Sequence, residues 1–120
     1  FNRKKNTLDL VSFFGLSHDW KGKANIDFEN SLAQKAFEMK MPIKIIDIGK
    51  EPRYRSAYLA KKNDICSLLL IPLIFQSKLV GSLSLYANAE KTLEIFENEF
   101  IEKYAKLIEV IVGVLMQKKE

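Results

Sequence analysis

The chain has very little of the two residue types that most often bind metals and carry redox chemistry. It contains one cysteine, Cys66, and one histidine, His18, among 120 residues. A lone cysteine excludes an intrachain disulfide and is compatible with a reducing compartment, so we expect a cytoplasmic protein. Because no His-x-x-x-His or Cys-x-x-Cys spacing is present, we predict that the protein binds no metal and no cofactor.

Motifs for catalysis are also lacking. The sequence has no glycine-rich phosphate loop, no Gly-x-Ser-x-Gly motif and no paired acidic residues in a pattern typical of a catalytic cleft. A catalytic domain requires a cluster of titrating groups, and the sequence shows none. We therefore expect a protein that is not an enzyme.

Long hydrophobic runs and strongly basic tracts are absent as well. No apolar run approaches the ~20 residues of a membrane-spanning helix, and no signal peptide opens the chain, so we expect no membrane partner. The net charge of +4 comes from 19 basic and 15 acidic side chains, and the basic residues form short, scattered clusters. Because aromatic residues are not interleaved with these clusters, the sequence disfavours a nucleic-acid partner.

What the sequence does contain is the composition of a soluble globular domain, with 48% hydrophobic and 28% charged residues. A chain of this length has room for one domain and one core. Residues 64–87 contain two apolar, branched runs separated by a polar turn at Gln76–Lys78, which predicts a β-hairpin. The first run, Ser67–Phe75, is apolar on both faces and must be covered on both sides. We expect this hairpin to be the centre of a sheet.

The second run of the hairpin alternates between two kinds of face. One face carries Leu79, Gly81, Leu83 and Leu85, and the other carries Val80, Ser82, Ser84 and Tyr86. The first face is apolar and the second is partly hydroxylic. A buried face of this second kind suits a small-molecule pocket, and equally suits a polar core patch with satisfied hydrogen bonds.

Shorter elements are expected before the hairpin. Alternation predicts a strand over residues 7–16, and helical spacing predicts a helix over about residues 31–40, with Asp27 or Asn30 as its cap. Residues 43–48 are expected to form a strand that ends near Asp47. This carboxylate either accepts a hydrogen bond from a ligand or braces the turn that follows.

Three aromatic side chains are further candidates for ligand contact. Trp20 lies in a polar loop, residues 17–25, and either stacks on a flat ligand or anchors the loop at the edge of the core. A helix predicted from Pro52 to about Lys62 places Tyr54 and Tyr58 one turn apart on one face. These tyrosines either enclose a pocket over the hydroxylic face of the hairpin or are hydrogen-bonded core residues.

A long C-terminal helix is predicted to begin between Leu93 and Glu97. Its apolar residues form two adjoining stripes, one of Phe100, Tyr104, Leu107, Ile111 and Val114, the other of Ile101, Ala105, Ile108, Val112 and Leu115. A helix on a sheet needs only one stripe, so the second should meet another helix, either a preceding helix or the same helix of a second copy. Gly113 is expected to let that neighbour approach closely.

The order of these features resembles that of GAF domains. In that family a proline, a strand and an Asp precede an Asp-Pro-Arg-Tyr-like turn, a helix, Ser-x-x-x-x-Pro-Leu, a tight turn and Val-Gly-x-Leu. The corresponding residues here are Pro42, Asp47, Pro52–Tyr54, Ser67, Pro72–Leu73, and Val80–Gly81 with Leu83. The resemblance covers about Thr7–Leu115. It implies an α+β fold, an antiparallel sheet with a long C-terminal helix on one face and short helices over the other.

The resemblance also implies what precedes the sequence. The family's first helix and first strand are not matched, so we expect residues 1–120 to be one GAF-like domain that lacks them. GAF-like reductases of free methionine sulfoxide need several cysteines, and bilin-binding members use a cysteine in the helix before Ser67. The single Cys66 fits neither group.

The function implied is that of a cytoplasmic sensor. An unidentified small molecule would bind among Asp47, Trp20, Tyr54, Tyr58, Ser82, Ser84 and Tyr86. Its occupancy would be relayed through the C-terminal helix to an output domain on the parent chain. The alternative is a ligand-free interaction module that forms a homodimer through the same helix.

Overall fold

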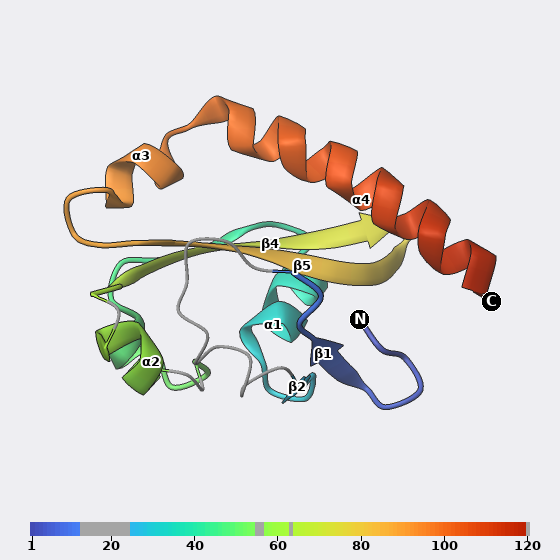
Figure 1. Ribbon diagram of the computed structural model, residues 1–120, viewed down its shortest axis with the longest axis horizontal. Helices are drawn as coiled ribbons and strands as arrows, with labels where there is room; N and C mark the ends of the chain where they lie inside the picture. Colours follow the sequence, from blue (N-terminus) through green and yellow to red (C-terminus); the bar gives the residue numbers. More distant parts are fainter. Residues whose placement is uncertain (13–24, 55–56, 63, 120) are drawn as a thin grey trace.

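The computed structural model describes residues 1–12, 25–54, 57–62 and 64–119 (Figure 1). Its central sheet has three antiparallel strands in the order β3–β4–β5, namely β3 (Ile43–Ile45), β4 (Ser67–Phe75) and β5 (Lys78–Ala87). A second, two-stranded sheet pairs β1 (Thr7–Asp9) with β2 (Asn25–Asp27). This α+β architecture confirms the predicted fold class.

The β4–β5 hairpin forms the longest strand pairing among the described residues and confirms the predicted centre of the sheet. Its strands pair from Ser67–Ala87 to Phe75–Lys78. The connecting residues Gln76 and Ser77 both have positive φ, 51° and 65°. This is the geometry of a type I′ turn, whose twist matches that of the two strands.

The central sheet separates two hydrophobic clusters. Leu69, Ile71 and Leu73 of β4 pack beneath α4 (Glu99–Lys119), against Ala105. The alternate residues Leu68 and Leu70 pack with α1 (Leu32–Met39) on the opposite side. Figure 1 shows α3 and α4 over one face of the sheet and α1 and α2 over the other. Both faces of β4 are covered, as its uninterrupted apolar sequence predicts.

The N-cap of α1 is neither of the two predicted residues, but Ser31, which follows Asn30 directly. The Ser31 hydroxyl accepts a hydrogen bond from the Gln34 N–H at 3.0 Å, so Ser31 is the N-cap and the assignment to Asp27 or Asn30 is wrong. Gln34 in turn accepts from the Asn30 N–H at 2.8 Å. The Ser31 side chain satisfies a backbone donor that the first helical turn leaves unpaired, and the Gln34 side chain satisfies one that precedes the helix. The helix ends at Met39, and its C-cap, Lys40, has a left-handed φ of 54°.

Several predicted elements are shorter in the structure. The strand expected over residues 7–16 extends only from Thr7 to Asp9, residues 10–12 have no regular structure, and residues 13–16 lie outside the described part. The strand expected over 43–48 ends at Ile45, and a 3₁₀ helix, η2 (Ile48–Lys50), begins three residues later. The described part of α2 is Ala57–Lys62, not a helix from Pro52.

The C-terminal region contains two helices instead of one. The short helix α3 (Thr92–Phe96) is followed by α4, which begins at Glu99. The Asn98 side chain accepts a hydrogen bond from the Phe100 N–H at 3.0 Å and thereby caps α4. The prediction that one long helix begins between Leu93 and Glu97 is therefore wrong. No described helix is long and apolar enough to cross a membrane.

Candidate functional site

Two tyrosines from distant parts of the chain meet on the sheet face that lies away from α4. The Tyr54 hydroxyl donates to the Tyr86 hydroxyl at 3.2 Å, and the two rings meet edge to face with centroids 6.3 Å apart. Both side chains pack against the α1-side cluster that contains Leu68. Tyr86 lies directly opposite Leu68 in the β4–β5 pairing. The structure therefore places two phenol groups on an apolar floor.

A turn, and not a helix, positions Tyr54. The Tyr54 N–H donates to the Glu51 carbonyl at 3.1 Å, and the Glu51 carboxylate accepts from the Arg53 N–H at 3.2 Å. These bonds hold residues 51–54 outside α2. The prediction that Tyr54 and Tyr58 share one helix face is wrong for Tyr54, and the side chain of Tyr58 lies outside the described residues.

Both phenols are held in their neutral form by their surroundings. Burial raises the pKa of Tyr54 well above its usual value, and the neighbouring Tyr86 raises it further. Burial also raises the pKa of Tyr86, although the hydrogen bonds from Tyr54 and Ser84 partly offset this effect. Because desolvation disfavours a phenolate, the pair presents uncharged hydroxyls at neutral pH. Such groups can exchange their mutual hydrogen bond for bonds to a polar ligand atom.

The two candidate serines of β5 continue this hydroxylic face. Ser84 lies opposite Leu70, which belongs to the α1-side cluster, and Ser82 lies opposite Pro72. Both serines are half-buried. The structure thus brings four of the candidate residues, Tyr54, Ser82, Ser84 and Tyr86, to one side of the sheet.

Val80 does not share that face. The register shifts between Leu73 and Ile74, so that Leu73 faces Gly81 and Ile74 faces Leu79. Val80 is left between these pairs, and its side chain joins the α4-side cluster. Simple alternation predicted that Val80 lies on the same face as Ser82. This prediction is wrong, because the extra residue of the bulge turns the Val80 side chain to the other face of the sheet.

Of the two remaining candidates, Asp47 and Trp20, the structure describes only Asp47. Asp47 accepts from the Gly49 N–H at 3.0 Å, and its half-exposed carboxylate lies 3.9 Å from the Lys50 ammonium. This geometry favours the bracing role over ligand contact. Trp20 lies outside the described residues, as does the rest of the loop from residue 17 to residue 24.

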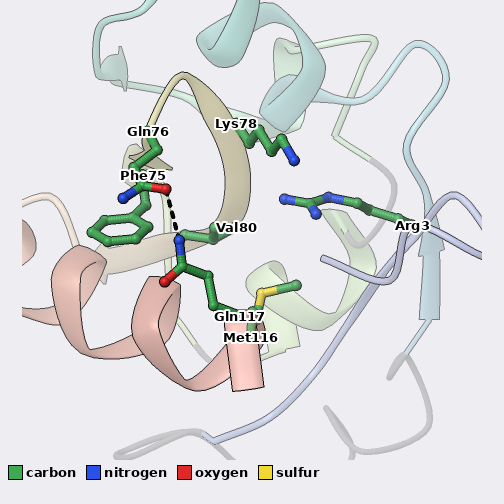
Figure 2. A pocket seen from close by; sticks show the side chains of 8 residues that line it. Arg3, Phe75, Gln76, Lys78, Val80, Met116 and Gln117 are labelled. Atoms are coloured by element: carbon green, nitrogen blue, oxygen red, sulfur yellow. Dashed lines mark hydrogen bonds between the residues drawn. The ribbon is translucent and has the colours of Figure 1, made fainter. Parts of the chain in front are cut away.

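Two cavities lie on the α4 side, and sequence reasoning predicted neither. The smaller has a volume of about 40 Å³ and lies between the hairpin tip and the last turns of α4. Figure 2 shows its lining, including Gln117, whose amide donates to the Gln76 side chain at 2.6 Å, and Arg3 and Lys78, which extend toward each other. A cavity of this size holds about one water molecule, too little for an organic ligand.

The larger cavity, about 210 Å³, lies between α4 and the part of β4 that extends beyond β3. There the Glu109 carboxylate accepts from the Ile74 N–H at 2.6 Å. Pro72, one of the lining residues, has no N–H to offer. Together these residues leave this strand edge with few free donors, which disfavours pairing with another strand. Three separate segments line the cavity, so no local motif marks it.

Gly113 contributes to the same side of the molecule. A Cβ at position 113 would lie 2.6 Å from the Phe75 Cβ and closer still to the Phe75 ring. The glycine therefore lets α4 approach the hairpin tip. The prediction that it admits a neighbouring helix is wrong.

Metal-binding clusters do not occur in the described part of the chain. No three histidine, cysteine, aspartate or glutamate side chains come together there in a way that would hold a metal ion. Cys66 is a half-buried free thiol that precedes β4.

Comparison with solved structures shows which fold this is. The chain is similar to a type II free methionine-R-sulfoxide reductase from Thermoplasma acidophilum, with a TM-score of 0.68 and 17% identity over 90% of this chain and 71% of that one. It is also similar to the GAF domain of a phosphoenolpyruvate-protein phosphotransferase from Coxiella burnetii, with a TM-score of 0.62 and 22% identity over 88% and 63% of the two chains.

A third similar structure is a GAF domain/HD domain protein from Geobacter sulfurreducens, with a TM-score of 0.71 and 10% identity over 95% of this chain and 78% of that one. No protein-family model and no curated protein matches the sequence. The chain therefore has a GAF-like fold, which confirms the resemblance seen in the sequence as far as the fold is concerned.

Proposed function

We propose that this domain is a small-molecule-sensing regulatory module, with its ligand bound against Tyr54 and Tyr86. The observation that carries the proposal is the hydroxyl pair on an apolar floor, 3.2 Å from oxygen to oxygen. Neutral donors and acceptors over hydrocarbon suit a small, uncharged and partly apolar ligand better than an ion. The regulatory role is supported by the GAF-like fold, which similar structures use as one domain of larger proteins.

A buried hydroxyl chain offers a route from this site to the C-terminal helices. Tyr86 adjoins Ala87, whose carbonyl accepts from the Cys66 N–H at 3.0 Å and from the Ser67 hydroxyl at 3.1 Å. The Ser67 and Thr92 hydroxyl oxygens lie 2.7 Å apart, and Thr92 is the first residue of α3. A ligand that moves Tyr86 would therefore move the start of α3 and, through it, α4.

The relay is supported by the sharing of one hairpin between both sides of the sheet. Leu68 and Leu70 of β4 contact the α1-side cluster, and the intervening Leu69 contacts the α4-side cluster. Packed cores resist continuous deformation, so a shift on one face is passed to the other. We propose that the parent chain carries an output domain that responds to α4, and that the protein is cytoplasmic.

The test combines thermal denaturation with hydrogen exchange. A library of uncharged small metabolites is screened for compounds that raise the melting temperature, and the best compound is used for exchange measurements. We expect slower exchange in residues 84–87 and in α3 and the first turns of α4. Tyr54→Phe and Tyr86→Phe should abolish the stabilisation, whereas Tyr104→Phe, on the exposed face of α4, should retain it. Equal stabilisation of all variants would contradict the site.

A second function, pairing of two copies without a small ligand, is favoured by a separate observation. Seven large apolar side chains of α4 are 40–63% exposed: Phe100, Tyr104, Leu107, Val110, Ile111, Val114 and Leu115. Contiguous exposed apolar surface of this kind marks an interaction site more often than a free surface. We propose a homodimer through α4, which is compatible with either function.

We further propose that the chain has no catalytic activity of its own. One structurally similar protein is a reductase, but this sequence has a single thiol and therefore no second cysteine to resolve an oxidised one. Purified protein should not reduce free methionine sulfoxide with a thiol reductant. Turnover that is lost in Cys66→Ser would overturn this proposal.

A further inference from the structure

The exposed apolar face of α4 has a spacing that determines what it can pair with. Its centre is the outer stripe, Phe100, Tyr104, Leu107, Ile111 and Val114, whose intervals alternate between four and three residues. These intervals are those between the a and d positions that form the seam of a two-stranded coiled coil. Other residues of α4, including Ile101, Ala105 and Ile108, pack against the sheet. The outer stripe is therefore available for a second helix.

A second copy of this chain fits the area that is exposed. Taking roughly 170 Å² for a complete side chain, the seven exposed residues present about 600 Å² on one helix. Two copies would bury about 1,200 Å² in total, the lower bound for a specific interface. A twofold axis brings identical surfaces together, and a uniform apolar seam is complementary to itself.

The two residues that flank the stripe distinguish between the possible arrangements. Val110 is 48% exposed and Leu115 is 54% exposed, and they lie on opposite sides of the outer stripe. In a parallel, in-register pair, a residue on the Val110 flank of one helix contacts the residue five positions later in the sequence of the other helix. Val110 would then contact Leu115 of the partner subunit, and both exposed side chains would be covered.

The antiparallel arrangement covers less of the exposed apolar surface of α4. With Tyr104 opposite Val114, each Leu115 lies at the level of the partner's Lys103, and the nearest apolar residue on that flank is the partner's Ile101, which already packs against the sheet. Leu115 would remain exposed. We infer that two copies pair through α4 in parallel and in register, with same-numbered residues of the outer stripe facing each other. This inference rests on the proposed homodimer and adds its geometry.

The seam should end after Val114. The next position in the repeat is Lys118, where a parallel pair brings two ammonium groups together. Both chains would then leave the pair at the same end, so that any segments following α4 would lie side by side. The arrangement thus gives the proposed relay a single direction for both subunits.

Disulfide cross-linking distinguishes the two arrangements. The test uses a Cys66→Ser background. There Val114→Cys, in the outer stripe, should form a covalent dimer under mild oxidation at least about tenfold faster than Lys106→Cys, which lines the larger cavity and lies outside the stripe. In an antiparallel pair the two introduced thiols would be about ten residues, or ~15 Å, apart, which is beyond the ~7 Å Cα separation that a disulfide can span. Mixed Tyr104→Cys and Val114→Cys proteins should not cross-link to each other.

Light scattering and one disruptive variant complete the test. Leu107→Glu should give a monomer with an unchanged circular dichroism spectrum, and Leu93→Glu, equally exposed but outside α4, should remain dimeric. A dimer that cross-links only between positions 104 and 114 would overturn the parallel arrangement and leave the proposed homodimer standing. A monomer at every concentration, without cross-links at either position, would overturn both.

Discussion

At the scale of single residues, the contact between Gly113 and Phe75 shows how one missing side chain sets the position of a helix. Glycine weakens an exposed helix by about 1 kcal/mol relative to alanine, so alanine at 113 would be favourable if nothing lay beside it. Here the Phe75 ring occupies the space that a Cβ would need. The two effects have opposite signs, and the clash with the half-buried Phe75 ring is the larger.

Gly113→Ala should therefore destabilise the domain, by about 1–3 kcal/mol in urea unfolding, despite its better helix propensity. In a Phe75→Ala background the same substitution should lose its penalty, because the ring that it meets is gone. A stabilising effect of Gly113→Ala in the wild-type chain would show that α4 is not held against the hairpin tip.

The tyrosine pair has a consequence for stability at alkaline pH. The folded-state pKa values of Tyr54 and Tyr86 are raised, so the folded state retains protons that the unfolded state releases above about pH 10. Stability should be independent of these groups below that pH and should fall as pH rises above it. Tyr54→Phe should make this alkaline decline shallower in urea titrations between about pH 9 and 11. An unchanged decline would mean that the Tyr54 phenol ionises as readily in the folded state as in the unfolded chain.

At the scale of elements, hydroxyl hydrogen bonds connect the hairpin to α3, and the number of hydroxyl protons determines the direction of each bond. Ser67 and Thr92 have one proton each, and their oxygens also lie close to the Ala87 and Asn88 carbonyls. Both carbonyls already accept a backbone N–H, from Cys66 and Lys91. Since Ser67 donates its proton to the Ala87 carbonyl, Thr92 is the donor in the bond between the two hydroxyls, and no buried hydroxyl or carbonyl is left unsatisfied.

Thr92→Val, which keeps the shape of the side chain but removes this link, should cost about 1–2 kcal/mol in urea unfolding. It should also accelerate hydrogen exchange in α3 more than in β4. The double variant with Ser67→Ala should cost less than the sum of the single variants, because the two hydroxyls satisfy each other. Additive costs would indicate that the hydroxyls act independently.

The elements also show where sequence patterns were sufficient. The bounds Ser67–Phe75 were predictable because an apolar run and a polar turn are both local signals. The strand over residues 7–16 was overextended, because alternation does not reveal where a pairing partner ends. The break at Asn98 and the turn at Glu51 depend on single side-chain hydrogen bonds that periodicity does not register.

The same distinction applies to the candidate site. Tyr54 and Tyr86 were predicted on opposing elements, and the structure brings them into contact. Their proximity was predictable from the side of the sheet to which the Tyr86 side chain points, even though the placement of Tyr54 in a helix was wrong. The exclusion of Val80 could not be predicted, because a bulge depends on how two strands pair. The two stripes of α4 were predictable residue by residue, except that Met116 replaces Leu115 against the sheet.

At the scale of the whole molecule, one sheet serves two surfaces with different chemistry. The side that carries α1 holds the hydroxyl pair and the serines of β5, and the side that carries α4 holds an apolar cluster beneath a helix that is itself apolar on its outer flank. Ligand on the first surface and pairing on the second would be coupled through the same hairpin. The proposed sensing and the proposed homodimer thus use opposite sides of one sheet.

Native mass spectrometry of the purified chain, with and without a mixture of uncharged small metabolites, tests this account most directly. We predict that the wild-type protein and Tyr104→Phe retain a small-molecule adduct on each 13.8 kDa chain, and that the double variant Tyr54→Phe/Tyr86→Phe retains none. An adduct-free spectrum for the wild-type chain, or an adduct of equal abundance on all three proteins, would contradict the proposed sensing site.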